Sequence, residues 1–184
     1  MVKRRTLLVG LGAAPAVYLA GCGSDGPDAS ACATQPLTDE HSCLVCGMTI
    51  VNYPGPKGQV CRRDQPMGMF CSTSDMFAWA LQPESKPATL RLYVHDMGAT
   101  DWDNPSDDAY IDAHEAYYVI DHPKTGAMGP TLAAFGQQAD AEAFAAQHDG
   151  RILRFDEVDF DVLSALAAQM HQMRGMQGGH GHGH

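Results

Sequence analysis

Basic residues are scarce in this sequence of 184 residues. Twelve lysines and arginines stand against 22 aspartates and glutamates, which gives a formal net charge of −10 at pH 7. Three of the basic residues and none of the acidic ones lie in residues 1–21, so the rest of the chain carries 9 − 22 = −13. A surface this acidic repels nucleic acid and anionic lipid head groups, and it attracts basic partners or cations. We therefore expect no nucleic-acid partner.

The sequence also lacks a good membrane-spanning run. Residues 1–21 combine a basic start, an apolar middle and small residues before Cys22, as an export signal does. This segment is too short and too interrupted by glycine and proline to span a membrane well. Residues 19–22, "LAGC", resemble a bacterial lipoprotein box, in which cleavage precedes the cysteine and its sulfur carries the lipid, and Arg4-Arg5 resembles a twin-arginine signal. We expect export by the Sec or twin-arginine route and lipid anchoring through Cys22 on the periplasmic side.

Residues 22–40 are small, polar and rich in proline and glycine, which predicts a flexible tether. The body that follows shows one order of elements twice. In residues 41–100 we expect strands at "GMTIV" and "GQVCRR" around the turn "NYPGPK", then the helix "STSDMFAWAL" and the strand "ATLRLYVHD". In residues 101–172 we expect strands at "AYYVID" and "PTLAAF", the helix "QADAEAFAAQH", the strand "RILRFDEV" and a terminal helix "DVLSALAAQMHQM".

Three residues recur with identical spacing in the two halves: a strand-end aromatic, an acid at the start of a helix and an aromatic within that helix. They are Phe70, Asp75 and Trp79 in the first half, and Phe135, Asp140 and Phe144 in the second. Because the order of elements agrees as well, the sequence predicts an α+β fold of two related β-β-α-β units with short helices, followed by a C-terminal helix.

Cysteine usage is the next distinctive feature. Besides Cys22 there are five cysteines, at positions 32, 43, 46, 61 and 71. An odd number in an exported chain leaves at least one thiol for a purpose other than an internal disulfide. Cys61 with Cys71, or either of them with Cys32, is the expected structural bridge. A disulfide between Cys43 and Cys46 is the simplest alternative use of "CLVCGM".

Two other chemistries fit that motif less well. A thioredoxin-like motif needs a helix start to lower the pKa of its first thiol, whereas Thr49, Ile50 and Val51 favour a strand. A zinc site usually has four ligands, of which two form a second pair close together in the sequence. Cys61 and Cys71 are too far apart in the sequence to form such a pair, but His41 is a further possible ligand, so zinc is not excluded. A thiol-disulfide module or a structural zinc site therefore remains an alternative.

Met48 points to a softer metal. If residues 47–51 form a strand, Cys46 and Met48 project to the same side of it. A thiolate and a thioether are soft ligands that favour Cu(I), although methionine also fills irregular gaps in cores. The sequence holds ten methionines, several of them beside glycine or histidine, which favours copper.

Taken in order, these segments resemble the NosL family, lipoproteins that act as copper chaperones for nitrous oxide reductase. The matching segments are the lipoprotein box at Cys22, Cys-Gly-Met at 46–48 before "YPGPKGQ", "GAMG" at 126–129 and "ADAEAFAAQHDGRILRFDEV" at 139–158. The resemblance implies a fold like that of organomercurial lyase. It also implies that the chain is not an enzyme and that it delivers Cu(I) to nitrous oxide reductase, with a membrane transporter as a further partner.

The resemblance also implies a ligand set that draws on both halves of the body. It places Cys46, Met48 and Met128 at the copper site, and we add Cys43 as the other thiol of the motif. The chain departs from the family pattern at Ala127, where proline is common, and Cys61 and Cys71 fall outside that pattern. An enzyme that cleaves carbon–mercury bonds is the alternative from another class, because it fits the same architecture and paired thiols.

The C-terminal residues 173–184 are rich in methionine, histidine and glycine. Imidazole and thioether groups can bind Cu(I) or Cu(II) without a preformed pocket. We therefore expect auxiliary, low-affinity copper capture by His171, Met173, Met176, His180, His182 and His184.

Overall fold

A computed structural model describes residues 32–178, with side chains described as far as Met173. The export signal, the lipidation site at Cys22 and the histidines at 180, 182 and 184 lie outside the described residues, as does the side chain of Met176. Between residues 32 and 178, no helix combines the length and the apolar character needed to cross a membrane.

The first sheet has four antiparallel strands in the order β2-β1-β3-β4, and the helix α1 connects β2 to β3. The elements are β1 (Gly58–Arg62), β2 (Gly68–Phe70), α1 (Thr73–Ala80), β3 (Thr89–His95) and β4 (Tyr110–Asp112). A short 3-10 helix, Asp107–Ala109, precedes β4. The helix α1 begins after Ser72, whose side chain accepts a hydrogen bond from the backbone N–H of Asp75, as an N-cap residue does.

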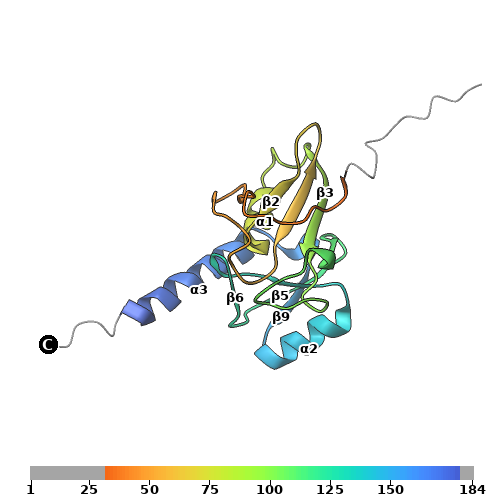
Figure 1. Cartoon of the computed structure of the whole chain (residues 1–184). Helices are drawn as coiled ribbons and strands as arrows, with labels where there is room; N and C mark the ends of the chain where they lie inside the picture. Colours follow the sequence, from red (N-terminus) through yellow and green to blue (C-terminus); the bar gives the residue numbers. More distant parts are fainter. Residues whose placement is uncertain (1–31, 179–184) are drawn as a thin grey trace, which may run out of the picture.

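The second sheet has three antiparallel strands in the order β8-β5-β9. Its elements are β5 (Tyr117–Ile120), β8 (Ala133–Phe135), α2 (Gln138–His148) and β9 (Arg151–Arg154). A small hairpin, β6 (Thr125–Gly126) with β7 (Gly129–Pro130), lies between β5 and β8, and a 3-10 helix, Phe155–Glu157, follows β9. The last element is α3 (Phe160–Gly178), whose C-terminal half projects away from both sheets (Figure 1).

The repeat seen in the sequence has a structural counterpart. In both sheets the first strand of the unit lies between the second strand and the strand that follows the helix. Phe70 packs on Trp79 with ring centroids 5.7 Å apart and planes at 47°, and Phe135 packs on Phe144 at 5.1 Å and 48°. The mixed α+β architecture is thus as predicted, with β4 as an addition to the first sheet.

One predicted strand is wrong. Residues 47–51, "GMTIV", form no strand, and only an isolated bridge joins Ser42 to Thr49 within this stretch. The backbone instead turns tightly, because the N–H of Gly47 bonds to the carbonyl of Cys43 at 2.9 Å and the N–H of Cys43 bonds to the carbonyl of Met48 at 3.0 Å. Gly47 has φ of +75°, a conformation that glycine adopts without strain. The argument that Cys46 and Met48 share one face of a strand therefore fails.

The two units share one core. Phe77 of α1 contacts Tyr118 of β5 edge-on, with centroids 4.9 Å apart, and Phe155 at 5.0 Å. Leu166 of α3 is buried in the same cluster. The predicted terminal helix ended at Met173, and α3 runs five residues further, to Gly178, so that the first part of the methionine- and histidine-rich segment is helical.

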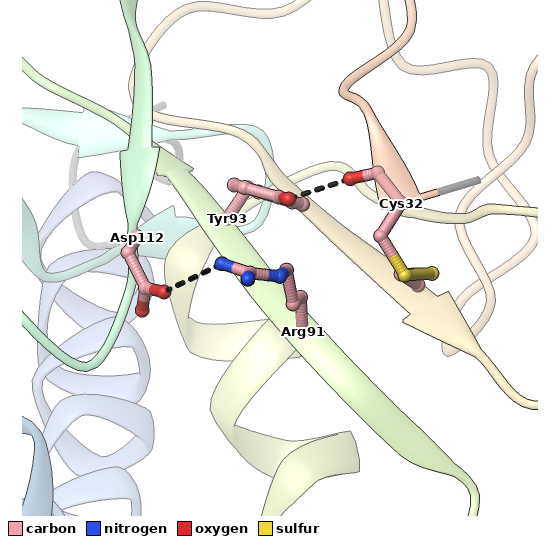
Figure 2. The surroundings of a disulfide bond; sticks show 5 residues. Cys32, Arg91, Tyr93 and Asp112 are labelled. Atoms are coloured by element: carbon pink, nitrogen blue, oxygen red, sulfur yellow. Dashed lines mark hydrogen bonds and ion pairs between the residues drawn. A yellow bond between two sulfur atoms is a disulfide. The ribbon is translucent and has the colours of Figure 1, made fainter. Parts of the chain in front are cut away.

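The structural disulfide joins Cys32 to Cys61 across a sequence separation of 29. It is one of the pairings that the sequence left open, and it fastens the start of the described chain to β1. Figure 2 shows the hydroxyl of Tyr93 donating a hydrogen bond to the carbonyl of Cys32, and the ion pair of Arg91 with Asp112 close by. Cys71 therefore does not serve as the partner of Cys61.

Candidate metal centre

Three thiols and one carboxylate converge between the first unit and the turn that precedes it. The sulfur atoms of Cys43, Cys46 and Cys71 and a carboxylate oxygen of Asp75 all lie within 4.8 Å of one another. Cys43 and Cys71 are buried, whereas Cys46 is exposed. The cluster therefore has a closed side made by two thiols and an open side at Cys46.

The local backbone explains why these four residues meet. The turn at residues 43–48 is tied to β2, because the N–H of Leu44 bonds to the carbonyl of Met69 at 2.9 Å and Cys43 forms a bridge with Met69. Cys71 directly follows β2, and Asp75 lies in the first turn of α1, held by the N-cap at Ser72. A turn, a strand end and a helix start thus supply the donors, and α1 begins at the cluster.

Asp75 links the two buried thiols. Its Oδ2 atom lies 3.2 Å from the sulfur of Cys43 and 3.2 Å from the sulfur of Cys71, within hydrogen-bonding distance for a thiol donor. The sulfur of Cys46 lies 3.6 Å from that of Cys71. These contacts hold three sulfur atoms close together without a covalent bond between them.

The thiols ionise at different pH values. The hydrogen bond from the thiol of Cys71 lowers the pKa of Cys43 to about 6, which outweighs the opposing effect of burial. The same pairing, with burial and the charge of Asp75, raises the pKa of Cys71 well above its usual range. Desolvation raises the pKa of Cys46. At neutral pH the cluster therefore offers one thiolate, and an incoming metal ion must displace protons from the other two thiols.

A buried lysine stabilises the segment that leads into β1. The ammonium group of Lys57 donates hydrogen bonds to the carbonyls of Tyr53 and Pro54, both at 2.7 Å. Burial lowers the pKa of Lys57 to about 8, and the charge of Cys71 acts in the opposite direction. A negative charge on Cys71 would therefore favour the protonated form of Lys57.

The predicted methionines lie beside this cluster. Met128, 38 % exposed, sits in the turn between β6 and β7 and lines a pocket of about 210 Å³ together with Asp75. It also lines a second pocket, of about 470 Å³, together with Met48. Met128 therefore connects the cluster with the region around Met48, and both halves of the body contribute to the surroundings of the thiols.

Cys71 is the donor that the sequence did not assign. The sequence offered it only as one possible partner in a structural disulfide, and the structure places its sulfur 3.6 Å from that of Cys46 and 3.2 Å from a carboxylate oxygen of Asp75. Its position immediately before Ser72, the cap of α1, places it next to Asp75 in the first turn of that helix, and this is a signal that could have identified it. Of the predicted auxiliary residues, His171 is exposed on α3 and Met173 is half-buried.

The donor set fits a thiophilic ion. Three thiolates suit Cu(I), which accepts two to four soft ligands. Three thiolates with one carboxylate would also complete a tetrahedral zinc site. The exposed position of Cys46 leaves one side of such a complex accessible to a second molecule.

Comparison with known proteins supports this chemistry. A family model described as NosL matches residues 34–163. The copper-binding lipoprotein NosL of Stutzerimonas stutzeri is 42 % identical over 167 residues, which cover 89 % of this chain and 87 % of that protein. The protein of the same name from Achromobacter cycloclastes is 33 % identical over 159 residues, which cover 84 % of this chain and 81 % of that protein.

Solved structures agree with the sequence relatives. The crystal structure of the copper chaperone NosL from Shewanella denitrificans matches with a TM-score of 0.66 and 41 % sequence identity, over 67 % of this chain and 93 % of that chain. The family model alone covers well over half of the sequence. On these grounds, and in agreement with the resemblance seen in its motifs, the chain belongs to the NosL family.

Proposed function

We propose that this protein is an exported, lipid-anchored copper chaperone that binds Cu(I) at Cys43, Cys46 and Cys71 and delivers it for assembly of the copper site of nitrous oxide reductase. The observation that carries the proposal is the cluster of three sulfur atoms, two buried and one exposed. Such a cluster can hold a soft ion tightly and still present it to a partner. The names of the family relatives, which describe copper binding, support the choice of metal.

Transfer would proceed by ligand exchange. Cu(I) imposes no fixed coordination geometry, so a donor from a recipient can add at the open side before the buried thiols leave. Cys46, as the exposed ligand, would dissociate first, and protonation of the raised-pKa thiols Cys46 and Cys71 would favour release. Met48 and Met128 would supply thioethers beside the cluster, so that copper leaves through soft donors without entering water.

The destination and the location of the protein belong to the same proposal. The relatives are named lipoproteins, and Cys22 follows the lipoprotein-box pattern, which supports a membrane anchor on the periplasmic side. Nitrous oxide reductase is the proposed recipient, with an associated membrane transporter as a further partner. The acidic surface, with a net charge of −10 for the full sequence, would steer the chaperone toward a basic face of such a partner.

A competition titration tests the copper site. Reduced protein is titrated anaerobically with Cu(I) in the presence of a chromophoric Cu(I) chelator, at a ratio that reports the dissociation constant. Cys46→Ser should weaken binding at least about tenfold, which corresponds to about 1.4 kcal/mol. Met128→Leu should weaken it less, with the fold intact by circular dichroism. Unchanged competition in both variants would show that the site lies elsewhere.

A second candidate function follows from the contact of Asp75 with two thiols. An organomercurial lyase needs thiolates to bind mercury and an acid to protonate the departing carbon, and Asp75 lies 3.2 Å from Cys43 and from Cys71. A fold related to organomercurial lyase would agree with the paired β-β-α-β units. Release of benzene from phenylmercury by the reduced protein would support this function.

A structural zinc site is the remaining alternative. It would be supported if the protein bound one zinc ion and failed to take Cu(I) from a competing chelator.

The C-terminal tail would capture copper at low affinity. The tail contributes four possible copper ligands beyond the last described side chain, Met173. They are Met176, His180, His182 and His184. Truncation after Met173 should lower the total copper bound in excess metal and leave the tight site unchanged. Loss of tight binding on truncation would mean that the tail supplies a ligand to the main site.

A further inference from the structure

Trp102 is buried in a loop at a point where three segments of the chain meet. It lies between β3 and the 3-10 helix Asp107–Ala109, outside any strand or helix, and it is only 8 % exposed. A large aromatic side chain that is buried in a loop ties this loop to its neighbours. The contacts of Trp102 therefore show which parts of the molecule the loop holds together.

Two hydrogen bonds join Trp102 to the other two segments. Its carbonyl accepts a hydrogen bond from the backbone N–H of Gly55 at 2.7 Å, and its indole Nε1–H donates to the carbonyl of Thr125 at 3.0 Å. Gly55 belongs to the segment that connects the thiol turn to β1, and Thr125 is the first residue of β6. A single residue thus links the first unit to the small hairpin of the second.

The two linked segments also touch each other beside Trp102. A Cβ atom at Gly55 would lie 3.0 Å from the Cα of Gly126 and 3.5 Å from a ring carbon of Trp102. Gly55 has φ of +80°, so glycine meets the demands of both the backbone conformation and the close approach. The start of the hairpin is therefore held directly against the segment that leads into β1.

The indole ring is also packed within the second unit. It stacks on Phe144 of α2 with centroids 6.1 Å apart and planes at 11°, and the ring of His122 meets it edge-on at 5.6 Å. The ammonium group of Lys124 lies 5.1 Å from its centroid. None of these contacts uses the indole N–H, so a phenylalanine at this position would keep the packing and lose only the bond to Thr125.

The hairpin that receives this bond has little else to define it. Only two residue pairs join β6 to β7, and one member of the first pair, Pro130, has no N–H to donate to the ladder. A hairpin this short is marginal on its own. The bond from Trp102 therefore contributes directly to fixing the turn at residues 127–128.

We propose that Trp102 is a positioning residue for copper binding, because it anchors β6 and so fixes the turn that carries Met128 relative to the first unit. Thr125 and Met128 line one pocket together with Tyr53 of the first unit, so the anchored strand and the thioether border the same space. Groups that orient a metal ligand influence affinity without touching the metal. This role rests on the proposed chaperone function, in which Met128 supplies a thioether beside the thiols.

A double-mutant cycle tests the role on the reduced mature protein, titrated anaerobically with Cu(I) against a chromophoric chelator. Trp102→Phe should weaken Cu(I) binding about threefold, and no more than Met128→Leu does. The double variant should bind as Met128→Leu alone does, because both changes act through one thioether. Phe135→Leu is the matched control, since Phe135 is buried in the same cluster as Trp102, and it should lower stability without changing Cu(I) affinity.

Amide hydrogen exchange on the metal-free protein gives a second measurement that is independent of copper. In Trp102→Phe the amides of residues 125–129 should exchange faster, because the hairpin has lost its anchor, while those of β2 should not change. Both results together support the positioning role.

The opposite results would overturn it. Effects of Trp102→Phe and Met128→Leu that add in the double variant, or unchanged exchange of the hairpin, would show that Trp102 does not act through Met128. Equal weakening by Phe135→Leu would show that a general loss of stability is the cause. Failure of the chaperone proposal would look different, because Cys46→Ser would then leave Cu(I) binding unchanged while the hairpin still exchanged faster in Trp102→Phe.

Discussion

Removal of the thiol of Cys71 should change the ionisation of Cys43. The pKa of Cys43 is lowered from 9.0 to about 6, and the largest cause is the hydrogen bond from Cys71. Cys71→Ala removes this donor and leaves Cys43 buried, so its pKa should rise toward its usual value. At pH 7 the fraction of Cys43 present as thiolate should then fall below the roughly nine-tenths that a pKa of about 6 gives.

The assay is a pH titration of the thiolate absorbance in the far ultraviolet, on reduced, metal-free protein. The wild-type protein should show one thiolate forming near pH 6, and Cys71→Ala should lose this step. Cys46→Ala is the matched control, because it keeps the backbone group of Cys46 that lowers the pKa of Cys43, and it should keep the step. A step near pH 6 that survives in Cys71→Ala would refute the hydrogen bond as its cause.

Copper affinity should follow the same ionisation. In the wild-type protein one thiolate is ready above about pH 6, while the raised pKa values of Cys46 and Cys71 mean that binding still releases protons. Affinity for Cu(I) should therefore rise with pH through neutrality. In Cys71→Ala the affinity at pH 7 should be lower and its dependence on pH should extend to higher values, because Cys43 must now also lose a proton.

Three further predictions concern oxidation, the disulfide and acid stability. Mild oxidation should join Cys46 to Cys71, whose sulfur atoms are 3.6 Å apart, and abolish tight Cu(I) binding; peptide mapping that found Cys43 joined to Cys46 would contradict this. Cys32→Ser should lower the free energy of unfolding by roughly 3 to 4 kcal/mol, measured by urea denaturation, because the disulfide closes a loop with a sequence separation of 29. Burial lowers the pKa of His122 from 6.5 to about 4, so the unfolded chain takes up a proton more readily and stability falls as the pH drops through this interval. In His122→Phe the loss of unfolding free energy between pH 7 and pH 5 should be smaller than in the wild type by about 2 kcal/mol. An equal loss in the two proteins would show that His122 is not its cause.

The sequence predicted the local elements of the body well. The N-cap at Ser72 and the apolar spacing that follows it identify α1, because these signals act within a few residues. The matching aromatic pairs predicted the repeat, and Phe70–Trp79 and Phe135–Phe144 show why, since each holds a helix against its own sheet. Such signals are readable because cause and effect lie close together in the chain.

The thiol cluster could be predicted only in part. Cys43 and Cys46 are visible as a motif, but Cys71 joins them through contacts that span 25 residues and depend on how β2 and the preceding turn pack. The β-branched residues after Met48 favoured a strand, and the left-handed conformation of Gly47 overrode that preference. The pairing of Cys61 with Cys32 likewise depends on where the tether returns to β1, which spacing does not reveal.

The coordination of copper in the loaded protein tests the central claim most directly. X-ray absorption at the copper edge should be measured on protein loaded anaerobically with one equivalent of Cu(I), in the wild type and in Cys71→Ser. We predict the edge of Cu(I) with sulfur as the dominant neighbour, and a loss of one sulfur neighbour in Cys71→Ser, because Cys71 lies with Cys43 and Cys46 in one cluster. A first shell dominated by nitrogen or oxygen, or an identical sulfur count in the variant, would contradict the three-thiol site.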